Sequence, residues 1–232
     1  MAVTEAQARR AAHRLDVTWD AKVKDPRETK NQRHGHHGML SVLAVAFACG
    51  RFSLRWVEDF SEDLPRWTKR RLGIGHRVSD TTLYRVLSAQ ELAGFRETVW
   101  KQVRSLMEQK AIRPRELFRY GVLSIDGKCS WASTGKELEG AKRSEDPTTG
   151  LVTSSLTTVR AVLTSSAVRP CLDMEMVPAK SGEAPAFRTL FPRVCGEFGR
   201  AIDIVTVDAG ITARENAQVI QGWGKHYLMA LK

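Results

Sequence analysis

The sequence predicts an α+β protein, in which a small helical domain is followed by an α/β domain with a mixed sheet and flanking helices. Between residues 40 and 110, apolar side chains recur at helical spacing. After Pro114, short aliphatic and β-branched runs alternate with helical patterns. Proline disfavours the helical conformation of the residue before it, so the last predicted helix of the first part ends before Pro114. We therefore place the domain boundary there, between residues 1–114 and 115–232.

The charge of the chain favours a polyanionic partner. The 232 residues carry a net charge of +10, and 42% of them are hydrophobic, which is ample for a folded core. Residues 1–114 hold 21 Lys and Arg against 13 Asp and Glu, whereas residues 115–232 hold 15 against 13. The positive excess therefore lies in the first domain, although charge alone does not distinguish nucleic acid from an anionic membrane.

Cysteine spacing and hydropathy indicate a cytoplasmic protein. The four cysteines form no CxxC pair, so neither a zinc site nor a disulfide framework is expected. The longest apolar run, Met39–Cys49, is too short to cross a bilayer and does not resemble a signal peptide. We therefore expect no membrane partner.

The first domain opens with a predicted helix at Glu5–Leu15 and a polar connector. Three histidines at positions 34, 36 and 37 allow a metal site, but no acidic or cysteine partner accompanies them. A polar lead-in to a helix, with Arg33 near a phosphate, is the favoured interpretation. The core helix that follows is expected to bury four residues, Leu40, Leu43, Ala44 and Phe47.

Two short helices with serine caps, Ser53 and Ser79, flank a predicted basic connector at residues 66–71. This arrangement resembles a helix-turn-helix, whose second helix faces DNA. A small helical bundle with a solvated polar face fits the same pattern. The candidate DNA contacts in this domain are Lys69, Arg70, Arg71, Arg77 and Arg85. A longer helix is predicted at residues 91–110, with Leu92, Phe95, Val99, Val103 and Leu106 facing inward.

The second domain is predicted as strand, strand, strand, helix, strand, helix, strand. The intervening residues 135–149 are predicted to form a loop, and Pro192 is expected to bend or shorten the first helix. Thr212 and Glu215 have the spacing of a capping box for the second helix. The predicted strands are 121–126, 151–164, 168–177, 204–207 and 226–232.

Two of these strands end in an acid followed by small residues, at Asp126-Gly127 and Asp208-Ala209-Gly210. One such ending is usually only a turn. If the two strands are neighbours in a parallel sheet, however, both carboxylates lie at the edge where open α/β sheets place their chemistry. The element order is that of a ribonuclease H-like core without its last helices. In such sites carboxylates hold two divalent cations that act on a phosphodiester, and Mg²⁺ suits these oxygen ligands.

Several motifs, taken in order, resemble those of bacterial DDE transposases of the ISAs1 or H-repeat-associated group. In the first half, Asp25-Pro26-Arg27, Arg33-His34 and Ser79-Asp80-Thr81-Thr82-Leu83 are similar to the helical domain of that group. In the second half the matching motifs are Asp126-Gly127-Lys128, Lys180-Ser181-Gly182-Glu183, Val207-Asp208-Ala209-Gly210, Arg214-Glu215-Asn216-Ala217 and His226-Tyr227-Leu228-Met229-Ala230-Leu231-Lys232.

The resemblance implies an enzyme that cleaves and joins transposon-end DNA with Mg²⁺, for which Mn²⁺ can substitute, held by Asp126 and Asp208. Lys128 and Lys180 are candidate phosphate contacts, although a solvated lysine or a structural ion pair fits them equally. The resemblance assigns no role to Glu183. Relatives usually carry a third acid on a helix beyond the last strand, and only 24 residues follow Asp208. We therefore expect a C-terminally truncated member with impaired catalysis.

Two other functions fit the same residues. The chain could be a non-catalytic DNA-binding remnant that occupies transposon ends or inhibits full-length transposase, or a structure-specific nuclease with the same core. The expected partners are double-stranded DNA and either a second copy of the chain or a full-length transposase. As a bacterial DNA-binding protein it would lie in the cytoplasm at the nucleoid.

Overall fold

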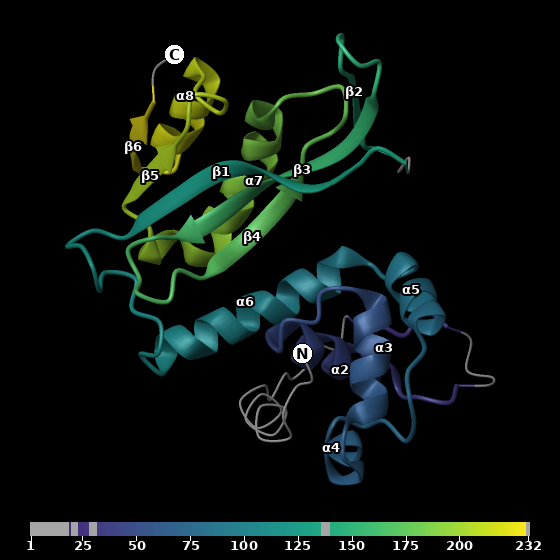
Figure 1. Cartoon of the computed structure of the whole chain (residues 1–232). Helices are drawn as coiled ribbons and strands as arrows, with labels where there is room; N and C mark the ends of the chain where they lie inside the picture. Colours follow the sequence, from purple (N-terminus) through teal and green to yellow (C-terminus); the bar gives the residue numbers. More distant parts are fainter. Residues whose placement is uncertain (1–18, 20–22, 28–31, 136–139, 231–232) are drawn as a thin grey trace. The chain divides into compact units, whose positions relative to one another are not determined.

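The computed structural model describes residues 19, 23–27, 32–135 and 140–230 (Figure 1). The predicted helix Glu5–Leu15 lies outside the described residues. The chain forms two compact units, residues 1–98 and 99–232, and each is described by itself. This division lies within helix α6 (Leu92–Glu108), ahead of the predicted boundary at Pro114. The reason is that Trp100 and Val103, in the second part of α6, belong to the core of the second unit.

The first unit is a group of helices around an apolar core. The serine caps were predicted correctly, since Ser53 accepts a hydrogen bond from Trp56 N and Ser79 accepts one from Thr82 N. The core is formed mainly by Met39, Val42, Val45, Val57, Phe60, Ile74, Val78, Leu83 and Val86. The helices are α2 (His36–Ala48), α3 (Leu54–Asp63), α4 (Arg66–Arg71) and α5 (Asp80–Ser88).

Two details of the first unit differ from the sequence prediction. The buried face of α2 is turned toward Met39 and Val42, and the predicted inward residue Phe47 is 40% exposed. Almost every residue of this helix is apolar or small, so hydropathy does not fix which side is buried. The predicted basic connector is the helix α4, because arginine and lysine are good helix formers and Pro65 precedes its first turn.

The second unit contains a mixed sheet (Figure 1). Strand β1 lies in the middle, pairing antiparallel with β3 and parallel with β5, and β6 continues the parallel side. Strands β2 and β4 both pair antiparallel with β3. Strand β2 lies in the stretch predicted to be a loop. The strands are β1 (Val122–Ser133), β2 (Lys142–Glu145), β3 (Val152–Leu163), β4 (Cys171–Met176), β5 (Ile204–Val207) and β6 (His226–Met229).

Helix α7 (Glu183–Phe198) packs against β3 and β4 and contributes much of the core, including the stacked rings of Phe187 and Phe191. It continues through Pro192, so the prediction that this proline shortens the helix was wrong. A short 3₁₀ turn, Gly199–Ala201, leads to β5, and α8 (Arg214–Gly222) leads to β6.

Two further sequence predictions about helices are corrected. Leu92, Val99 and Leu106 of α6 are exposed, and its buried large side chains are Trp100 and Val103. Helix α8 has no side-chain cap, because the hydroxyl of Thr212 donates to the carbonyl of Asp208 and the predicted capping box does not form. None of the helices that the structure describes combines the length and apolar character needed to span a bilayer.

Candidate functional site

Strands β1 and β5 are direct neighbours and run parallel. Their paired residues end at Ile125 opposite Val207, so Asp126 and Asp208 each follow the last pair. Both acids are exposed. Asp208 directly follows β5, whereas β1 continues to Ser133, so the prediction that the first strand ends at Asp126 was wrong. The prediction that these two strands lie side by side is therefore confirmed. Because the strands are parallel and in register, the two carboxylates emerge at the same level of the sheet.

A third carboxylate, that of Glu183, reaches the same edge from the first turn of α7. Burial raises the pKa of Glu183, and the negative charges of Asp208 and Asp126 raise it further. Neighbouring carboxylates that repel one another are typical of sites that bind a cation. The sequence motifs left the role of Glu183 open, and the structure places it beside the two predicted acids.

Glycines make the approach of Glu183 sterically feasible. A Cβ atom on Gly127 would overlap the Glu183 carboxylate, lying 2.7 Å from Oε2. A Cβ atom on Gly210 would lie 2.7 Å from Glu183 Oε2 and 3.4 Å from Asp208 Oδ2. Any larger residue at either position would therefore occupy the space of the Glu183 side chain. The small residues after the two acids, which in sequence resemble turn residues, form the cradle for this third acid.

A local hydrogen bond positions Asp208, and strand pairing positions Asp126. The carboxylate of Asp208 accepts a hydrogen bond from Ile211 N at 3.1 Å, which fixes it over the turn that follows β5. Asp126 lies opposite Arg160 of β3. The guanidinium of Arg160 donates to the hydroxyls of Ser130 and Thr158, at 3.0 and 3.2 Å. These two hydroxyl groups therefore hold the guanidinium of Arg160 beside β1 and β3.

The donor set suits a hard divalent cation, because it consists of carboxylate oxygens. In the described ranges, no three His, Cys, Asp or Glu side chains already converge tightly enough to enclose an ion. Asp126 and Asp208 are exposed, so both carboxylates are accessible to a cation from solvent. The residues present thus fit a metal that draws the three carboxylates together.

The remaining predicted site residues lie in two places. In the second unit, Lys128 is exposed on β1 and Lys180 is exposed just before α7. In the first unit, Arg70 and Arg71 are exposed on α4. The other three residues have distinct surroundings: Lys69 donates to the carbonyl of Glu62, Arg77 pairs with two acids, and Arg85 is exposed on α5.

Comparison with known protein families matches residues 21–101 to the family described as DDE_Tnp_1-associated. This match supports a relation to DDE-type transposases. The matched stretch includes all of α2, α3, α4 and α5, so the helical unit is similar to a domain associated with transposases, which suggests a transposase-related function. No curated protein and no solved structure matches the chain.

Proposed function

We propose that the chain belongs to the ISAs1 or H-repeat-associated transposases, binds the double-stranded DNA of transposon ends, and contains a ribonuclease H-like core. The match of residues 21–101 supports the relation to transposases. The strand path β4-β3-β1-β5-β6, antiparallel on one side of β1 and parallel on the other, supports the ribonuclease H-like core, with β2 as an addition. In a bacterial cell such a protein would act at the nucleoid.

Mg²⁺ is the cofactor that the family resemblance implies, and Mn²⁺ can take its place. Asp126, Asp208 and Glu183 would hold it, since all three are oxygen donors and the glycine cradle keeps the space between them. When bound, such a cation supplies the activation of a water or 3′ hydroxyl and stabilises the leaving oxygen of a phosphodiester. Glu183 precedes β5 in the chain, whereas the family usually places its third acid after the last strand.

The chain's own residues would orient the DNA at this edge. Lys128 follows Asp126 by two residues on β1, and side chains two apart share a face of a strand. Its ammonium can therefore contact a phosphate next to the carboxylates. Lys180, exposed before α7, is placed for a similar contact on the Glu183 side.

The observation that carries this proposal is the pairing of β1 with β5, which puts Asp126 and Asp208 at one edge together with Glu183. The test is nicking of supercoiled plasmid DNA by the full chain in Mg²⁺, compared with the Asp126→Asn, Asp208→Asn and Glu183→Gln variants. Glu215→Gln is the matched control, because Glu215 is an exposed acid in the first turn of α8 and is not one of the charges that raise the pKa of Glu183.

We expect Mg²⁺-dependent nicking that the three cluster variants lose and the control retains. The assay also measures DNA binding in EDTA, which the cluster variants should keep. Binding without nicking by the wild-type chain would favour the alternative, a non-catalytic DNA-binding protein that occupies transposon ends or associates with full-length transposase. Nicking that survives Asp126→Asn would contradict the proposed catalytic site.

A further inference from the structure

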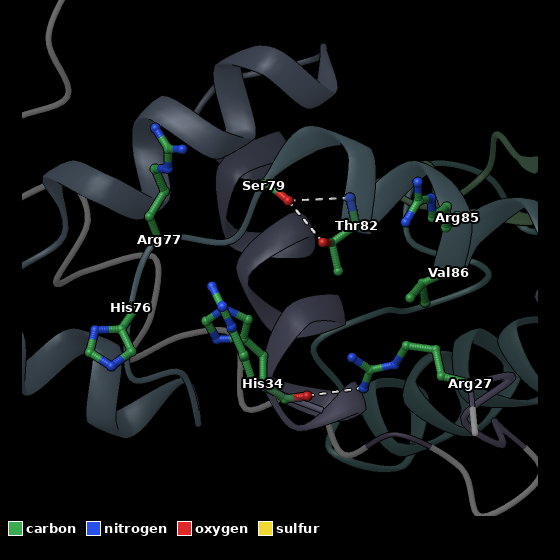
Figure 2. A pocket seen from close by; sticks show the side chains of 9 residues that line it. Arg27, His34, His76, Arg77, Ser79, Thr82, Arg85 and Val86 are labelled. Atoms are coloured by element: carbon green, nitrogen blue, oxygen red, sulfur yellow. Dashed lines mark hydrogen bonds between the residues drawn. The ribbon is translucent and has the colours of Figure 1, made fainter. Parts of the chain in front are cut away.

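The first unit contains a pocket with a strongly basic wall, far from the acids in sequence (Figure 2). Its volume is about 570 Å³, which is within the range of about 300–1,000 Å³ usual for ligand sites. Residues from three sequence segments converge on it. Among the described residues, the lining consists of Arg27, Arg33, His34, His76, Arg77, Ser79, Thr82, Arg85 and Val86.

Two of the four arginines are fixed by acidic partners. Arg27 pairs with Asp25 at 2.7 Å. It also donates to the backbone carbonyl of His34 at 2.9 Å, a hydrogen bond that Figure 2 shows. Arg77 lies 3.3 Å from Glu58 and 3.6 Å from Glu62. These contacts neutralise much of the charge of both arginines and hold the pocket wall in shape.

The other two arginines are exposed and available. Within the part of the chain that the structure describes, Arg33 and Arg85 make no ion pair at 4.0 Å or less. Arg33 lies in the connector before α2 and Arg85 lies in the last turn of α5. Two guanidinium groups from separate segments thus face one cavity without neutralising partners, an arrangement suited to a phosphate.

His34 provides an independent indication of an occupant. Its side chain is only 8% exposed, and its Nδ1 atom is buried without a hydrogen-bond partner among the described residues. Burial lowers the pKa of His34, and the positive charges of His76, Arg27 and Arg33 lower it further. The backbone carbonyl of Arg77 accepts from the ring and opposes this shift. An anion in the pocket would offset the surrounding positive charge.

We propose that this pocket binds one phosphate of a DNA backbone, with Arg33 and Arg85 as the charged contacts. The proposal rests on the DNA-binding function proposed above and names where the helical unit holds the DNA. Ser79 and Thr82, at the start of α5, add hydroxyl groups to the lining of the pocket. Tyr84, which is 64% exposed on the same helix, adds surface for contact with the DNA.

The test uses two probes on the full chain. Inorganic phosphate is titrated while the His34 ring is followed by NMR as a function of pH. A fluorescently labelled DNA duplex is titrated by anisotropy at several salt concentrations. Both are applied to wild type and to the Arg33→Gln/Arg85→Gln double variant. The control is Arg55→Gln, which removes one charge from an α3 side chain that is 73% exposed and does not line the pocket.

Phosphate is expected to raise the pKa of His34 in the wild type and to leave it unchanged in the double variant, because the anion would no longer be held beside the ring. The fit of the His34 titration curve must include the charged and titratable groups that face the ring, which are His76, Arg27 and Arg33. For the duplex, the slope of log K against log salt should fall by about 1 in the double variant, and the control should keep the wild-type slope.

Three results would overturn the proposal. They are an unchanged His34 pKa in the wild type at saturating phosphate, an equal loss of salt slope in the Arg55→Gln control, and a phosphate effect on His34 with no change of slope for DNA. The last result would show a site for free phosphate. The double variant leaves the acids of the second unit intact, so its Mg²⁺-dependent nicking at low salt tests the proposed catalytic site separately.

Discussion

Substitution of Gly127 by alanine tests the acidic cluster with minimal change to the fold. The added methyl group would occupy the place of the Glu183 carboxylate, which is the mobile end of a long side chain and can move away. Alanine in a strand gains about 0.5–1 kcal/mol over glycine, and an off-rotamer Glu183 costs about 0.5–1.5 kcal/mol. The two effects nearly cancel, so the stability of the metal-free protein should change by less than about 1 kcal/mol.

Metal affinity should respond strongly to the same change. Removal of a group that only orients a ligand costs about 10–100-fold in affinity, so displacement of the proposed ligand Glu183 should cost at least about 10-fold. The assay is calorimetric titration with Mn²⁺, together with thermal unfolding with and without the metal. A tenfold loss of affinity lowers the stabilisation by saturating Mn²⁺ by about 1.4 kcal/mol.

Two other glycines serve as controls for Gly127→Ala. A Cβ atom on Gly196 of α7 would have no neighbouring atom within 4 Å, so Gly196→Ala should leave Mn²⁺ affinity unchanged. A Cβ atom on Gly121 would overlap the carbonyl of Ala201, whose backbone cannot swing away, and this variant should lose about 3 kcal/mol of stability. Folded Gly127→Ala protein that binds Mn²⁺ as tightly as wild type would refute this reasoning.

Two further predictions concern stability. Ser61 is fully buried; its hydroxyl donates to the carbonyl of Glu58 at 2.7 Å and accepts from Val78 N at 2.9 Å. Ser61→Ala should therefore lower the free energy of unfolding, measured in urea, by about 1–3 kcal/mol. A loss below about 0.5 kcal/mol would show that these hydrogen bonds are unimportant. The hydrogen bond from Arg115 lowers the pKa of Asp203 below its ordinary 3.8, so this solvent-screened pair should contribute up to about 1 kcal/mol above that pH and lose its effect as the pH falls through the lower folded-state pKa. The difference between wild type and Asp203→Asn, measured by urea unfolding from pH 7 to 3, should therefore begin to decrease as the pH falls below about 4, and a constant difference would contradict the assignment.

The acid that follows β5 could be predicted from sequence because its signal is local, whereas the predicted end of the first strand at Asp126 was wrong, since β1 continues to Ser133. Four apolar residues buried on both faces predict a central strand such as β5, and an acid directly after it must lie at the strand's end. These features do not depend on the detailed packing of side chains.

The role of Glu183 could not be predicted in this way. Its place beside Asp126 and Asp208 depends on where α7 begins relative to the sheet, which is set by packing of the helix on β3 and β4. One signal was present in the sequence: a glycine follows each acid within two residues. Such glycines can mark the close approach of another group, but in sequence they are indistinguishable from turn residues.

The errors in the helical unit have a similar origin. The sequence of α2 is apolar on most sides, so only the tertiary packing decides that Val42 faces the core and Phe47 does not. The pocket around His34 was also beyond sequence reasoning, since it brings together residues from both sides of α3 and α4 in the chain. Long-range packing, rather than local propensity, determines these features.

The most direct test of the central claim is the location of the metal site by paramagnetic broadening. Mn²⁺ at substoichiometric concentration is added to the isotopically labelled chain, and the loss of amide signals is mapped along the sequence. Selective broadening of Gly127, Glu183 and Gly210 is predicted, and Asp126→Asn should weaken it. Broadening centred elsewhere, or equal broadening of all exposed acids, would contradict a shared cation site between Asp126 of β1 and Asp208, which follows β5.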